Sequence, residues 1–82
     1  MPLIQIEQDS PEVIDSARAL ITAMASEVRK ITARGNETAQ LDKARETAAV
    51  SGYLNALQFH GLLSLDKYSD LLAEKVAATK GA

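Results

Sequence analysis

The sequence contains no cysteine and no tryptophan, and it has a single histidine, His60. Without cysteine, neither a disulfide framework nor a thiolate metal site can form. One histidine cannot build a histidine-rich site either, so we expect no bound metal. The aromatic side chains number three, Tyr53, Phe59 and Tyr68, which is too few for a platform on which nucleic-acid bases stack.

An excess of positive charge is also missing. The 82 residues carry nine Lys and Arg against eleven Asp and Glu, for a net charge of -2, and this argues against nucleic acid as a partner. No glycine elbow, phosphate loop or paired metal-ligand spacing accompanies the serines and acids. A small helical chain offers little concave volume for a substrate. We therefore expect no enzyme, no catalytic residue and no cofactor.

The first ten residues, MPLIQIEQDS, have no cationic start, and their apolar run is only Leu3 to Ile6. This pattern is not that of a signal peptide. A membrane-spanning helix needs about 20 predominantly apolar residues, and no stretch of the chain provides them. We therefore expect a cytoplasmic protein that does not enter a membrane.

Capping signals separate an N-terminal arm, residues 1–9, from a first long helix. Ser10 can cap that helix, and Pro11 suits its first turn because the missing N–H would have been unpaired there. Apolar residues then recur at steps of three and four, which is typical of an amphipathic helix. Gly35 supplies the left-handed residue that ends it. The predicted helix covers residues 11–34.

A second helix is predicted at about residues 37–60. Asn36 or Thr38 is expected to cap it, and so short a connection requires it to run back antiparallel to the first helix. Gly61 is the expected turn residue that ends it.

A third, shorter helix is predicted at 64–79, opened by Ser64 and with a stripe of Leu65, Tyr68, Leu72 and Val76 beside Leu71. The expected fold is therefore all-α. A single domain, 1–82, would consist of an antiparallel helical hairpin and a third helix in a small bundle.

Between Thr47 and Leu65 the sequence has no Asp, Glu, Lys or Arg. On a helical wheel, one apolar face of this stretch carries Ala48, Gly52, Ala56 and Phe59, and the opposite face carries Val50, Tyr53, Leu54 and Leu57. We expect the first helix to cover one face, and the short third helix to leave part of the other exposed. The candidate interface of a homodimer is therefore Val50, Tyr53, Leu54 and Leu57. Arg18, on the polar side of the first helix, is expected to lie outside every such contact.

The joint between the second and third helices carries a recurrent pattern, formed by Leu54, Leu57, Gly61, Leu63, Ser64 and Tyr68. These residues, within 54–76, resemble the leucines, turn glycine, helix start and aromatic of the SHOCT family, a short C-terminal helical hairpin of bacterial proteins. Lys67 stands where that family usually has glutamate, and a later lysine is absent. The resemblance implies a role in association or oligomerisation.

Two functions fit these patterns. The first is a small non-enzymatic helical protein that acts by protein–protein interaction, binding itself and an unidentified protein partner. Accessory and inhibitor proteins of phages, prophages and plasmids are of this kind. The alternative is a dimeric nucleic-acid-binding transcriptional regulator that uses Arg29, Lys30 and Arg34 in place of its third helix.

Overall fold

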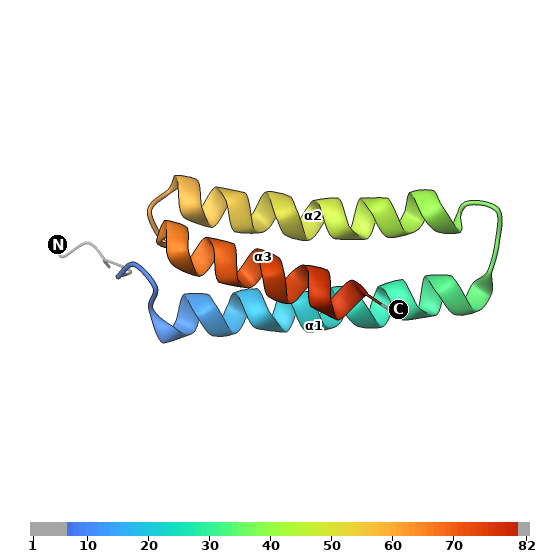
Figure 1. Ribbon diagram of the computed structural model, residues 1–82, viewed down its shortest axis with the longest axis horizontal. Helices are drawn as coiled ribbons and strands as arrows, with labels where there is room; N and C mark the ends of the chain where they lie inside the picture. Colours follow the sequence, from blue (N-terminus) through green and yellow to red (C-terminus); the bar gives the residue numbers. More distant parts are fainter. Residues whose placement is uncertain (1–6, 81–82) are drawn as a thin grey trace, which may run out of the picture.

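The computed structural model describes residues 7–80, in which α1 (Pro11–Arg34), α2 (Ala39–Phe59) and α3 (Leu65–Thr79) follow one another. Residues 7–80 contain no strand, so the predicted all-α class is confirmed. In Figure 1, α2 lies alongside α1 and runs in the opposite direction, and α3 packs against both. The predicted apolar segment of the N-terminal arm, Leu3 to Ile6, lies outside the described residues.

Serine hydroxyls cap two of the three helices. Ser10 Oγ accepts a hydrogen bond from the Val13 N–H at 3.3 Å, and Ser64 Oγ accepts one from the Lys67 N–H at 3.2 Å. Gly35 follows the last residue of α1 with a φ of 60°, the left-handed conformation. Each cap satisfies a backbone group that a helix end leaves without an intrahelical partner.

The second helix is shorter at both ends than the predicted 37–60. Thr38 precedes its first residue, but the Thr38 hydroxyl donates to the Asp42 carboxylate at 2.9 Å and makes no capping bond to the backbone. His60 follows the last residue of α2, and Gly61 then takes a φ of 76°. A positive φ at Gly61 lets the chain reverse within a few residues before α3 begins.

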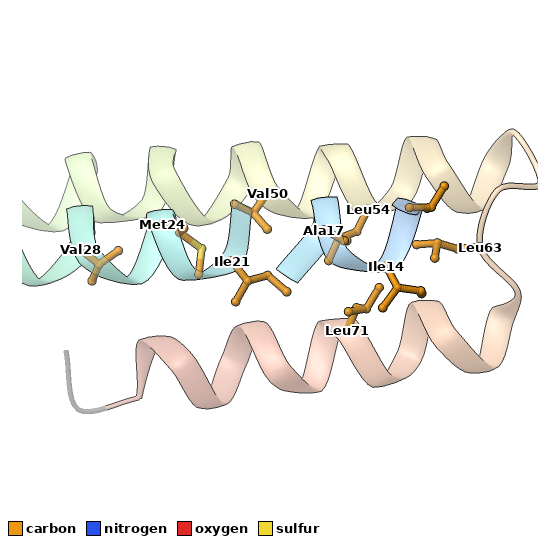
Figure 2. Packing of buried hydrophobic residues seen from close by; sticks show 10 residues of the cluster. Ile14, Ala17, Ile21, Met24, Val28, Val50, Leu54, Leu63 and Leu71 are labelled. Atoms are coloured by element: carbon orange, nitrogen blue, oxygen red, sulfur yellow. The ribbon is translucent and has the colours of Figure 1, made fainter. Parts of the chain in front are cut away.

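A hydrophobic core lies between the three helices, and Figure 2 shows its side chains pointing toward one another. It consists of Val13, Ile14, Ala17, Ile21, Met24, Val28, Val50, Leu54, Leu63 and Leu71. The largest fully buried side chains are Leu54 from α2, Leu63 from the turn and Leu71 from α3. Burial of a side chain of this size contributes roughly 1.5–3 kcal/mol to stability.

The third helix covers only one half of the α1–α2 pair, the half next to Gly61 (Figure 1). Its 15 residues make a helix of about 22 Å, whereas the 24 residues of α1 extend about 36 Å. The other half, around the α1–α2 connection, is therefore two helices thick. The molecule measures 52 × 25 × 17 Å.

Candidate protein interface

The predicted interface residues lie mostly inside the chain's own core. Val50 and Leu54 are 3% and 0% exposed, and Leu57 packs against the same cluster. Leu57 is half-buried, and Tyr53 is the exposed one of the four, with 37% of its area in contact with solvent. We expected the third helix to leave part of this face exposed, and Val50 and Leu54 do not fit that expectation, because α1 and α3 both pack against α2 on this side (Figure 2).

The opposite face of α2 is the one that faces solvent. We call it the outer face of α2, and its residues are Leu41, Ala44, Ala48, Gly52, Ala56 and Phe59. All six are exposed, and the two large side chains at its ends, Leu41 and Phe59, keep 53% and 80% of their area in contact with solvent. The second helix thus has an exposed apolar face on the side where we expected α1 to pack.

Small residues fill the middle of the outer face. A Cβ atom built on Gly52 meets no other heavy atom within 4 Å, so nothing in this chain requires glycine there. Glycine in the interior of a helix costs roughly 0.5–1 kcal/mol relative to alanine. Its presence at an open surface position therefore brings the chain no benefit as a monomer.

A shallow hollow adjoins the outer face between α1 and α2. Its volume is about 150 Å³, and its lining consists of Leu20, Ala23, Met24, Glu27, Glu46, Ala49 and Val50. The two glutamates are its only charged residues. This lining is mostly apolar, which fits a protein side chain better than a charged small molecule.

The predicted stripe of α3 is divided between the core and the surface. Leu71 is buried, Tyr68 and Leu72 are half-buried against the core, and Leu65 and Val76 are 69% and 58% exposed. The sequence predicted that Leu65, Tyr68, Leu72 and Val76 share one stripe, with Leu71 beside it. Leu71 reaches the core because it faces the space between α1 and α2, whereas Leu65 and Val76 lie on the outer side of the bundle.

A hydrogen-bonded clamp joins the start of α1 to the turn before α3. The Asp9 N–H donates to the Leu62 carbonyl at 2.9 Å, and the Ser64 N–H donates to Asp9 Oδ1 at 2.8 Å. Asp9 takes a φ of 60°, which is uncommon outside glycine. The side chain and the backbone N–H of Ser64 lower the pKa of the Asp9 carboxyl, because both stabilise its ionised form. The sequence alone gave no signal for this contact.

An ion pair joins α1 to α3. Arg18 donates from Nε and Nη2 to the two carboxylate oxygens of Glu74, at 3.0 and 3.1 Å. This bidentate contact lowers the pKa of Glu74 and raises that of Arg18. The sequence placed Arg18 outside the dimer contact and did not predict this ion pair within the chain. Nearby, Lys75 of α3 donates to the Ser51 hydroxyl of α2.

The cations considered for nucleic-acid binding lie at the far end of α1. Arg29, Lys30 and Arg34 are all exposed. Lys30 lies 3.6 Å from the Glu27 carboxylate, so part of this charge is locally balanced. Within residues 7–80, no three His, Asp or Glu side chains are grouped as a metal site would require. None of the helices described is long and apolar enough to cross a membrane.

Comparison with known proteins adds no family assignment. No model of a protein family, no curated protein and no solved structure matches this chain. What this chain binds must therefore be inferred from its own surface and packing.

Proposed function

We propose that this chain is a non-enzymatic protein that acts by binding another protein chain through the outer face of α2. The observation that carries this proposal is the exposure of Leu41 and Phe59 at the two ends of a face without a carboxylate. Large contiguous apolar patches on soluble proteins mark sites of interaction with proteins, ligands or membranes. Arg45 projects from the same side of α2 and is the one charged residue within this face.

The bundle behind this face acts as its scaffold in the proposal. An antiparallel α1–α2 pair, fixed by α3 and by the Arg18–Glu74 ion pair, keeps α2 straight and its outer face accessible. A preformed rigid face loses little entropy on binding. We place this role in the cytoplasm, and an accessory or inhibitor protein of a phage, prophage or plasmid is the setting we propose.

Site-specific photo-crosslinking tests the proposal in cells that express the chain. A benzoylphenylalanine introduced at Ala56, on the outer face, should give covalent adducts with protein after irradiation. The same residue at Ala73, an exposed alanine of α3, serves as the control and should give far fewer. Adducts with a second copy or with another protein would both support the proposal. Equal yields at the two positions, or none at Ala56, would refute it.

A further inference from the structure

We infer that the protein bound to the outer face of α2 is a second copy of this chain, packed antiparallel about a two-fold axis that lies beside the outer face at the level of position 50. This inference rests on the proposed function. It adds which protein binds the outer face and the direction in which its α2 runs. A two-fold dimer is the commonest closed assembly, and it requires a surface that is complementary to itself.

The outer face meets this requirement because its residue pattern is symmetric about its midpoint. Leu41 and Phe59 are 18 residues apart, about five turns at 3.6 residues per turn, so both project from the same side of α2. Position 50 lies halfway between them. In an antiparallel pair centred there, Leu41 of one copy lies opposite Phe59 of the other. A foreign partner would not require such symmetry.

The middle of the face fits the same arrangement. Ala48 and Gly52 lie two residues before and two residues after position 50. In the antiparallel pair, Ala48 of one copy therefore lies opposite Gly52 of the other. Small side chains at the crossing point let the two helix backbones approach closely. This contact gives a role to Gly52, whose Cβ position meets nothing in its own chain. The glycine that the monomer does not need is then explained by the second copy.

The charges of α2 favour the antiparallel direction. Asp42, Lys43, Arg45 and Glu46 all lie in the first half of α2, and its second half carries no Asp, Glu, Lys or Arg. An antiparallel pair places each charged half beside the uncharged half of the other copy, whereas a parallel pair places like charges at the same level. Opposed helix dipoles also favour the antiparallel pair.

Sedimentation equilibrium of the whole chain tests the occupant. The unmodified protein should be dimeric at about 100 µM. Ala48→Arg should raise the dimer Kd by at least about tenfold, because it puts a large charged side chain at the crossing point. Ala73→Arg, the same substitution on an exposed position of α3, should leave the Kd unchanged. Gly52→Arg provides a second variant with no neighbour to disturb in its own chain. Circular dichroism should show both outer-face variants folded.

Cysteine pairing tests the direction, and the absence of native cysteine makes it unambiguous. A mixture of Leu41→Cys and Phe59→Cys proteins should form a disulfide-linked dimer under mild oxidation. In that dimer the other end keeps a native Leu41–Phe59 contact. Neither variant alone should crosslink, because identical positions are about 27 Å apart along the axis of an antiparallel pair.

The possible outcomes separate the inference from the proposed function. A wild-type monomer at these concentrations, or a dimer that Ala48→Arg and Gly52→Arg leave intact, would overturn the second copy as occupant. Crosslinking of each single-cysteine variant with itself would overturn the antiparallel direction. If the chain is monomeric and benzoylphenylalanine at Ala56 still captures a different protein in cells, the proposed function stands and only this inference fails.

Discussion

Gly61 has a φ of 76° at the turn after α2, whereas Gly52 lies inside the helix and faces open space. The substitution Gly61→Ala should destabilise the folded chain by about 1 kcal/mol, because the Cβ of alanine makes the left-handed backbone conformation less favourable than it is for glycine. The control Gly52→Ala should stabilise the monomer by roughly 0.5–1 kcal/mol. Urea denaturation at low protein concentration measures both. Equal effects of the two substitutions would show that the backbone conformation at Gly61 is not what requires glycine.

Asp9 should make stability depend on acidic pH. Its pKa is lowered in the folded chain, so its contribution is complete above the unfolded pKa and is lost as the pH falls below about 4. Asp9→Asn keeps an oxygen that can accept from the Ser64 N–H but removes the titration. The variant should therefore lose less stability than the wild type between neutral pH and pH 3, as measured by thermal denaturation. An identical pH profile for variant and wild type would contradict this role.

A matched control for the Asp9 experiment is Asp70→Asn. Asp70 makes no hydrogen bond or ion pair with the residues that the structure describes. Its substitution removes one negative charge without removing a hydrogen bond, so a change in the pH profile that it shares with Asp9→Asn comes from net charge and not from the Ser64 contact. Glu74 also has a lowered pKa, so the loss that remains in Asp9→Asn is expected to come partly from the Arg18 contact.

At the level of the helices, the sequence predicted where the helices end better than it predicted which of their faces pack together. The ends of α1 and the start of α3 depend on residues next to one another in the chain, Ser10, Gly35 and Ser64, and the structure has helix ends at all three. The covered face of α2 depends on which partners pack against it, and apolar residues on both sides of the wheel leave that choice open. Burying Val50 and Leu54 removes more apolar area from water than burying Ala48 and Gly52, so the bulky face forms the core.

The predicted interface lay on the wrong face of α2 for the same reason, because α2 has apolar residues on both sides. The sequence identified α2 as the helix with two apolar faces, and the outer face is one of the two. The clue that could have selected it is side-chain volume. Leu63 and Leu71 pack in the core. A helix face with alanine and glycine at its centre has too little side-chain volume to fill the space around them, because protein interiors are closely packed.

The Arg18–Glu74 pair should hold α3 against α1. Arg18→Glu places a carboxylate beside Glu74 and should lower the thermal midpoint, whereas the double exchange Arg18→Glu with Glu74→Arg should restore most of the loss. Thermal denaturation in low and high salt measures this, and salt should reduce the difference because the pair is exposed to solvent. A double variant no more stable than the single one would show that the charges do not interact.

On the scale of the whole molecule, the two ends of the bundle are built differently. Leu63, Leu71 and Leu54 all lie in the half that α3 covers, whereas α2 contributes no buried residue before Val50. The far half relies on α1 side chains such as Val28 and Ile31. The radius of gyration of the whole molecule, 14.5 Å, exceeds the value of about 12 Å expected for a compact chain of this length. Chain length and composition did not predict this elongation, which depends on where α3 ends.

This asymmetry predicts a gradient of local stability along α2. Backbone amides of residues 42–47 should be at least about tenfold less protected from hydrogen exchange than those of 54–58, because fewer buried contacts must open to expose them. The measurement should use Gly52→Arg, so that a second copy cannot shield α2. Ile31→Ala should reduce protection further in the far half, while the amides near Leu54 change less. Uniform protection along α2 would mean that the bundle opens only as a single cooperative unit and that the third helix stabilises both halves equally.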